Sequence, residues 1–192
     1  MTLPALFDNL RIPLIGSPLF IISNPDLVIA QCKAGIVGSF PALNAREAEG
    51  EPIELDRWLT RIKEELDRHN QANPDNPAAP YAVNQIVHKS NTRLERDVEI
   101  CVKHEVPLWI TSLGAQEWLN DADGLIAVAA GAGGHAGALS PLALIQEIRE
   151  WFNGPVFLSG AIAKGDSILA AQAMGADGGY AGSAFIATQE AN

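Results

Sequence analysis

Short apolar runs alternate with helix-like segments along nearly all of this 192-residue chain, and this alternation limits the fold more than any other feature. Short runs bounded by glycine, proline or asparagine are typical of buried strands. Strands that alternate with helices form parallel sheets, and such sheets are covered on both faces. The expected strands cover residues 12–15, 36–40, 81–83, 107–111, 125–128, 156–158 and 179–181.

Helical patterns occupy five of the intervening segments. The clearest covers residues 53–69, where apolar residues recur at helical spacing. Asn24 and Pro25 suit the N-cap and the first turn of an earlier helix. The expected helices cover residues 24–34, 53–69, 92–104, 141–152 and 166–174. The sequence therefore predicts an α/β fold with seven parallel strands.

One interval is too short for this alternation. Between Thr111 and Leu125 the chain offers only SLGAQEWLNDADG, which has room for one or two helical turns. A crossover between parallel strands needs a dozen or more residues, usually as a helix. We therefore expect part of the alternating pattern to be missing here.

Composition indicates one soluble globular domain covering residues 1–192, since 47% of the residues are hydrophobic and 19% are charged. No apolar run reaches the roughly 18 residues that span a bilayer, and no basic segment precedes an apolar core at the N-terminus. A cytoplasmic protein without a membrane partner is expected. The net charge of −10 disfavours binding to nucleic acid.

Cysteine and most histidines are predicted to be structural. Cys32 and Cys101 are isolated and lie in expected helices, as reduced core thiols do. His69, His88 and His104 lie in or beside loops or at a helix end, where structural roles are usual. No carboxylate pair and no His/Cys cluster in the sequence suggests a metal.

The stretch from Asp123 to Ser140, DGLIAVAAGAGGHAGALS, combines an expected strand with a glycine cluster. Glycines allow the backbone to take positive φ and allow a flat ligand to approach closely. His135 is the only titratable side chain between Asp123 and Glu147. Two interpretations stay open: an alanine–glycine loop with a hydrogen-bonded surface histidine, and a ligand-binding loop with a reactive one.

Two later turns, LSGA at 158–161 and AGSA at 181–184, each follow an expected strand. In (β/α)₈ barrels, the loops after strands seven and eight form the usual phosphate site. Ser159 and Ser183 could donate hydroxyl hydrogen bonds there, beside backbone N–H groups. Ordinary N-caps would explain each turn alone, whereas the paired spacing favours a phosphate.

Several segments, in order, resemble the nitronate monooxygenase family, formerly called 2-nitropropane dioxygenases. They are IGSPLF, GSFPALNA and YAVNQ near the N-terminus, followed by AGAGGHAG, LSGAIAKG, AAQAMGAD and GSAFIAT. The resemblance implies an FMN-dependent, TIM-type (β/α)₈ barrel. It also implies that the enzyme oxidises alkyl nitronates or nitroalkanes with O₂ to carbonyl compounds and nitrite.

The resemblance also assigns site residues. His135 matches the catalytic base of the family's GGH motif. The residues that would bind the flavin or its phosphate are Ser17, Pro18, Leu19, Asn84, Gly133, Ser159, Gly160, Ala161, Gly182 and Ser183.

Two departures from the family pattern modify these expectations. The short interval after Thr111 lacks the family's fifth strand and a helix, and the family's C-terminal helical region, which covers the active site, has no counterpart. We therefore expect an incomplete barrel of about seven βα units. An FMN-dependent enoyl or NAD(P)H:quinone reductase and a non-catalytic flavin-binding remnant remain alternatives. Homo-oligomer formation is left open.

Overall fold

The computed structural model describes residues 3–47, 51–113 and 121–192. Within these ranges the chain forms seven strands, and every paired strand runs parallel to its neighbour. The strands are β1 (Leu14–Gly16), β2 (Gly38–Pro41), β3 (Tyr81–Ile86), β4 (Leu108–Ser112), β5 (Leu125–Val128), β6 (Val156–Ser159) and β7 (Gly178–Ala181). Each corresponds to one expected apolar run, so the predicted parallel α/β architecture is confirmed.

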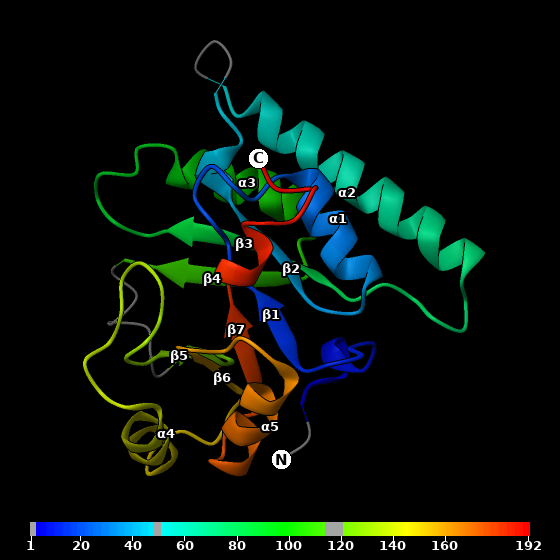
Figure 1. Cartoon of the computed structure of the whole chain (residues 1–192). Coiled ribbons are helices and arrows are strands. Elements are labelled where there is room, and N and C mark those ends of the chain that lie inside the picture. Colours follow the sequence, from blue (N-terminus) through cyan, green and yellow to red (C-terminus); the bar gives the residue numbers. More distant parts are fainter. Residues whose placement is uncertain (1–2, 48–50, 114–120) are drawn as a thin grey trace.

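The strands form two sheets that meet at β1. One sheet has the order β1-β7-β6-β5 and the other the order β2-β3-β4. A parallel bridge between Ile15 and Val37 joins them, so the strands follow one another around an open barrel from β5 to β4 (Figure 1). Among the described residues, β4 and β5 do not pair with each other. The structure is therefore the predicted incomplete TIM-type barrel.

The opening between β4 and β5 coincides with the interval that the sequence marked as too short. β4 ends at Ser112 and β5 begins at Leu125. Most of the connection, residues 114–120, lies outside the described residues. No strand is found between β4 and β5 in the part of the interval that is described, residues 113 and 121–124.

Within the described ranges, five α-helices cover the outside of the barrel. They are α1 (Pro25–Lys33), α2 (Ile53–Ala72), α3 (Leu94–Lys103), α4 (Pro141–Arg149) and α5 (Gly165–Ala173). All five were predicted, but α2 continues beyond residue 69 and α4 ends before residue 152. No helix in the described ranges is long and apolar enough to cross a membrane.

Local sequence explains where the helices begin. The Asn24 side chain accepts a hydrogen bond from the Leu27 N–H, and Pro25 occupies the first turn of α1, as predicted. Ser140 caps α4 in the same way by accepting from the Ala143 N–H. Both caps lie between a strand end and a helix, so they also shape the loops at the carboxyl face.

The barrel interior is an apolar cluster built from both sheets. Ile15, Val37, Ala82, Ile110 and Phe157 are buried in it, and partly buried residues of β5 and β7 pack against them. Side chains alternate between the two faces of a strand, so these positions define the inward-facing set. The N-terminal segment contributes Phe7, whose ring lies 5.5 Å from that of Phe157.

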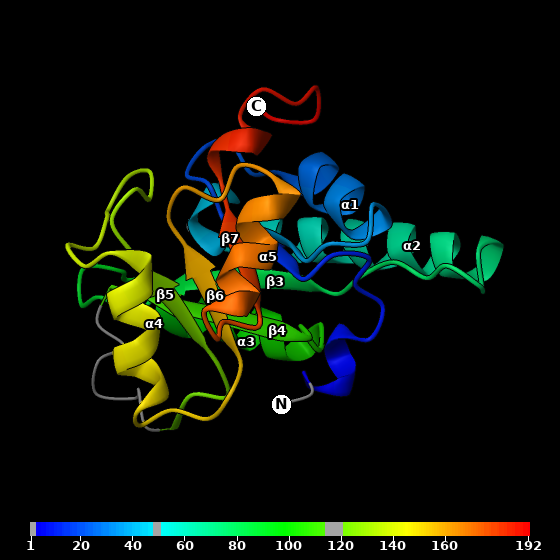
Figure 2. The ribbon, with the colours of Figure 1, turned by 60° about the horizontal axis from the view of Figure 1, so that its bottom comes forward.

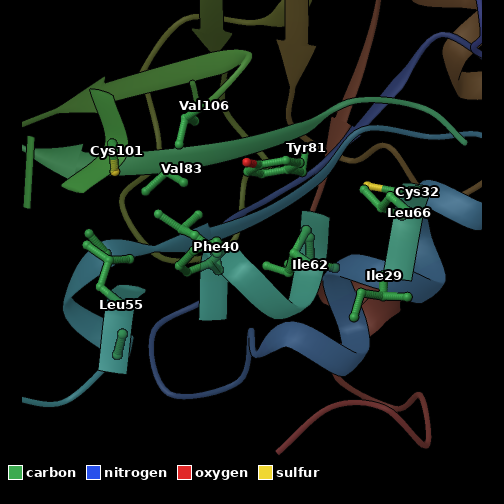
Figure 3. Packing of buried hydrophobic residues seen from close by; sticks show 14 of the residues in the cluster. Ile29, Cys32, Phe40, Leu55, Ile62, Leu66, Tyr81, Val83, Cys101 and Val106 are labelled. Carbon is green, nitrogen blue, oxygen red and sulfur yellow. The ribbon is translucent and has the colours of Figure 1, made fainter. Parts of the chain in front are cut away.

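The helices lie outside the strands (Figures 1 and 2), and separate clusters of apolar side chains join them to the sheets. Figure 3 shows the cluster under α1, α2 and α3, where Phe40 and Val83 meet Leu55 and Ile62 of α2. A second cluster lies between α4, α5 and strands β5 and β6. The helices therefore cover the outward faces of the strands with apolar side chains.

Both cysteines are buried free thiols in the first of these clusters, as predicted. Burial raises the pKa of Cys32 to about 12, and a backbone hydrogen bond from Gly38 acts in the opposite direction. Burial also raises the pKa of Cys101 to about 12. Both thiols therefore stay protonated at neutral pH and act as packing groups.

A buried ion pair fixes the loop after β2 to α3. Arg93 pairs with Asp97 at 2.8 Å, and the side chains are 11% and 0% exposed. Arg93 also donates to the Ala45 carbonyl at 2.8 Å and lies 3.3 Å from Glu47. Burial raises the pKa of Asp97, whereas the hydrogen bond and charge of Arg93 lower it. One guanidinium therefore links the start of α3 to the loop at 45–47.

We predict that Arg93→Met destabilises the protein strongly, because it leaves Asp97 buried without its charge partner. The expected loss in the free energy of unfolding is about 3–5 kcal/mol. Arg57→Met is the matched control, since Arg57 pairs with Glu54 on the surface and is 71% exposed. The control should cost about 0–1 kcal/mol. Urea unfolding measures the free energy of unfolding of both variants. Equal losses would contradict a stabilising role for the buried Arg93–Asp97 pair.

Candidate functional site

Because all strands are parallel, their carboxyl ends lie at one face of the barrel, where several predicted site residues meet. Four loops from the four-stranded sheet lie here: residues 17–24, 129–140, 160–164 and 182–187. The Ser17 N–H donates to the Ala181 carbonyl at 2.8 Å, and the Ala161 N–H donates to the Gly131 carbonyl at 3.0 Å. These bonds hold neighbouring loops together.

Close approaches at glycine show which predicted residues are neighbours. A Cβ on Gly133 would lie 3.3 Å from the Ser183 hydroxyl oxygen. A Cβ on Gly182 would lie 2.9 Å from the Leu19 Cδ2 and 3.2 Å from the Ser17 Cβ. The loops after β1, β5 and β7 are therefore in contact through residues that the resemblance assigns to flavin binding.

The loop after β6 is shaped by Gly160. Its φ is +132°, and a Cβ there would lie 3.0 Å from the Ala130 carbonyl oxygen. Ser159 is buried at the end of β6 and accepts a hydrogen bond from the Ala129 N–H through its carbonyl. Ala161 follows with φ +55° and is exposed. Gly160 thus lets the loop after β6 lie directly against the glycine loop.

These four loops contain no aspartate or glutamate, although the whole chain carries a net charge of −10. Their titratable side chains are His135 and Lys164. Within the described residues, no group accepts a hydrogen bond from the N–H of Gly182 or Ser183, whereas the Ala161 N–H is already bonded. Free N–H donors, an exposed Ser183 hydroxyl and the absence of carboxylates suit an anionic group such as a phosphate.

His135 is exposed within the glycine loop. No described residue hydrogen bonds to its ring. The other three histidines have partners: His69 lies near the Asn76 carbonyl, His88 near the Ser90 hydroxyl, and His104 near the Asp56 carboxylate at 2.8 Å. The surface histidine expected on the simpler interpretation would be hydrogen-bonded. The His135 imidazole is instead open to a ligand or to water.

Asn84 lies on β3, in the other sheet, and is 8% exposed. It lies two residues after inward-facing Ala82, and alternate residues of a strand share a face, so Asn84 also faces the barrel interior. Its Oδ1 accepts a hydrogen bond from the Ser112 hydroxyl at 3.1 Å. Asn84 therefore lies toward the carboxyl end of the interior, across the barrel from the glycine loops.

Tyr180 was missed by the sequence analysis. It lies on β7 and packs against the interior cluster, and its hydroxyl hydrogen bonds to Ser17. Burial raises the pKa of Tyr180, and the Ser17 hydrogen bond lowers it. With Ser17, Asn84 and Ser112, it adds polar groups at the carboxyl end of an apolar interior. Alternation along residues 178–181 was the signal that could have identified it.

No family model matches the sequence. Among curated proteins, the chain is similar to the putative monooxygenase Rv1533 of Mycobacterium tuberculosis, with 39% identity over 70 residues. That match covers 36% of this chain and 19% of the relative.

Solved structures match over almost the whole chain. FabK from Thermotoga maritima has a TM-score of 0.77 at 20% identity, covering 97% of this chain and 62% of that one. Nitroalkane oxidase from Streptomyces ansochromogenes has a TM-score of 0.76 at 20% identity, covering 97% and 69%. The enoyl reductase domain of MlnA from Bacillus amyloliquefaciens has a TM-score of 0.67 at 17% identity, covering 95% and 55%.

These matches confirm the barrel fold and the predicted resemblance to the fold of the nitronate monooxygenase family. Three of the four proteins are named as a monooxygenase, an oxidase or a reductase. The chain spans less than a fifth of the curated relative and between 55% and 69% of these solved chains.

We predict that Gly160→Ala destabilises the protein by about 1–3 kcal/mol, because alanine is strained at this φ and its Cβ would press on the Ala130 carbonyl. Gly165→Ala is the control. Gly165 begins α5, and a Cβ there would meet no atom within 4 Å. The control should be neutral or stabilising by up to about 1 kcal/mol. Thermal unfolding gives the stability of both variants. Equal stability would contradict the prediction that position 160 requires glycine.

Proposed function

We propose that this protein is an FMN-dependent oxidoreductase that oxidises alkyl nitronates with O₂, giving carbonyl compounds and nitrite. The observation that carries this proposal is the meeting of carboxylate-free loops at the carboxyl face of the barrel, with His135, whose ring bonds to no described residue, on one of them. The likeness to a nitroalkane oxidase and to a putative monooxygenase supports it. We further propose that residues 1–192 act as a single FMN-binding unit, whose substrates are the nitronate or nitroalkane and O₂.

The phosphate of FMN would be held by the loops after β6 and β7. The N–H groups of Gly182 and Ser183, which bond to no group in the described part of the chain, and the Ser183 hydroxyl are suitable donors to its oxygens. Ser159, Gly160 and Ala161 would form the other side of the phosphate site. Since no carboxylate lies in these loops, the anion would meet no like charge there.

The isoalloxazine ring would lie over the barrel mouth, between Ser17, Pro18 and Leu19 on one side and Gly133 on the other. Asn84 would face the ring from the interior. When bound, FMN supplies the electron-accepting centre that O₂ reoxidises. The protein groups bind and orient the cofactor and exclude water from the apolar interior beneath it.

His135 would act as the base. Histidine is the side chain that most often acts as a general base, because a ring nitrogen of the neutral imidazole can accept a proton. The proton would come from the carbon next to the nitro group, and it would reside on the ring nitrogen until solvent accepts it. Its exposure allows this exchange with water.

An FMN-dependent enoyl or NAD(P)H:quinone reductase is the alternative, and the likeness to the MlnA enoyl reductase domain favours it. The two reactions differ in their electron donor. O₂ uptake with a nitronate and no nicotinamide supports the oxidase. Rapid bleaching of the flavin by NADH or NADPH without O₂ supports the reductase, and a colourless protein that takes up no added FMN supports a non-catalytic remnant.

We predict that Ser183→Asp weakens FMN binding, because a carboxylate would face the phosphate. Like charges about 4 Å apart near a protein surface repel by roughly 1–4 kcal/mol, so the dissociation constant should rise about tenfold or more. Ser183→Asn, of nearly equal size but neutral, is the control, and the exposed position accepts both. Fluorescence titration of the apoprotein gives the constants. Equal affinities for the two variants would locate the phosphate elsewhere.

We predict that His135→Asn lowers kcat/KM for a neutral nitroalkane by about 10²–10⁴-fold, through loss of proton abstraction. FMN should stay bound, because other loops hold the phosphate. A pre-formed nitronate needs no deprotonation, so its oxidation should be affected less. Steady-state O₂ consumption by the wild type and the variant gives the loss of kcat/KM for each of the two substrates. Equal losses would make His135 a binding group, and no loss would make it a surface residue without a catalytic role.

A further inference from the structure

The loop after β1 is held by one buried side chain from the loop after β2. Asn44 ends the short 3₁₀ helix Ala42–Asn44 and is 8% exposed. Its Nδ2 donates to the carbonyls of Leu19 at 2.9 Å and Ser23 at 2.8 Å, and its Oδ1 accepts from the Ile21 N–H at 3.1 Å. One carboxamide thus satisfies three backbone groups of a single loop.

The residue at the centre of this loop is strained. Ile21 has φ +66°, a left-handed conformation that is a genuine outlier for a β-branched residue. Such conformations persist only when the surroundings hold them, and they gather at ligand sites. Ile21 is 53% exposed, so core packing does not hold it. Two hydrogen bonds to its backbone hold it instead: its N–H donates to the Asn44 Oδ1, and its carbonyl accepts from the Asn192 Nδ2 at 2.9 Å.

The segment that carries Asn44 is itself fixed. The Ala45 carbonyl accepts a hydrogen bond from buried Arg93. Two residues after Asn44, the Arg46 guanidinium lies 5.7 Å from the centre of the Phe20 ring, which belongs to the loop after β1. A cation at this distance is attracted to the ring face. The support of the β1 loop therefore runs back through the segment 44–46 to the ion pair in α3.

The same loop begins with three proposed flavin contacts. Ser17, Pro18 and Leu19 directly precede the strained turn, and the Leu19 carbonyl is one of the groups that Asn44 binds. We propose that Asn44 is a positioning residue, which holds residues 17–23 in the flavin-binding conformation before the cofactor arrives. This inference rests on the proposed function. When only a fraction of the protein is competent to bind, the apparent dissociation constant rises by the inverse of that fraction.

The test is Asn44→Ala, which removes all three hydrogen bonds without adding a charge near the phosphate. If about one tenth of the loop population stays competent, the dissociation constant for FMN rises about tenfold. Asn70→Ala is the control, because Asn70 accepts a hydrogen bond from the Ala78 N–H at the opposite end of the barrel. Its FMN affinity should stay within about twofold of the wild type even though loss of this bond lowers its thermal stability.

Amide hydrogen exchange at Ile21 provides a readout that does not depend on FMN. In the wild-type apoprotein the Ile21 N–H, bonded to Asn44, should exchange slowly although the residue is exposed, and in Asn44→Ala it should exchange fast. Fast exchange in the wild type, or an unchanged FMN affinity in Asn44→Ala, would overturn the inference. Failure of the wild type to bind FMN would overturn the proposed function instead, and the exchange measurement would still decide whether Asn44 holds the loop.

Discussion

Two backbone hydrogen bonds at β1 make one barrel out of two sheets. The Gly16 N–H donates to the Val37 carbonyl at 2.8 Å, and the Val37 N–H donates to the Leu14 carbonyl at 3.0 Å. The Ser39 hydroxyl adds a bond to the Gly16 carbonyl. Because β4 and β5 do not pair with each other in the described part of the chain, these bonds between β1 and Val37 provide the backbone continuity between the two sheets. The interior cluster, which includes Ile15 and Val37, reinforces it with buried apolar area.

The proposed site depends on the bonds between β1 and Val37 because its parts come from both sheets. The phosphate-binding loops and His135 belong to the sheet with β5, β6 and β7, whereas Asn84 belongs to the sheet with β3. The distribution of charge separates this face from the rest of the molecule. Acidic side chains gather on helices such as α2 and α3, where they form ion pairs with arginine and with Lys103. A strongly acidic protein can therefore present four neighbouring loops without carboxylates, since local placement rather than net charge determines what an anion meets.

The sequence predicted most of the fold because its signals are local. Apolar runs, caps and glycine turns are properties of neighbouring residues, and they predicted each of the seven strands and five α-helices that the described residues form. The predicted ends of α4 and β3 were wrong because contacts outside the local sequence pattern determine where these elements end. α4 stops at Arg149 because that side chain donates to the carbonyls of Phe152 and Gly154, although Trp151 and Phe152 continue the apolar pattern. β3 continues to Ile86 because β4 pairs with Asn84 and Gln85, whose polarity ends the apolar run.

The candidate site was predictable only in part. The meeting of Gly133 with Ser183 follows from the rule that parallel strands bring their carboxyl ends to one face. The bond between Ser17 and Tyr180 joins positions 163 residues apart in sequence, and no periodicity reveals it. Asn44 appeared within GSFPALNA, but a motif does not say which backbone groups a side chain will bind. Long-range hydrogen bonds of this kind emerge only when the loops have been placed.

The unpaired edges of β4 and β5 have a mechanical consequence. In a closed barrel, the ring of hydrogen bonds fixes the curvature of the sheet and the width of its mouth. Here the seven strands form an arc whose curvature is set by side-chain packing and by the joint at Val37. A ligand that contacts Asn84 at one side of the arc and Ser183 at the other would fix the distance between them. Binding at the mouth would then stiffen the whole arc, including strands that the ligand never touches.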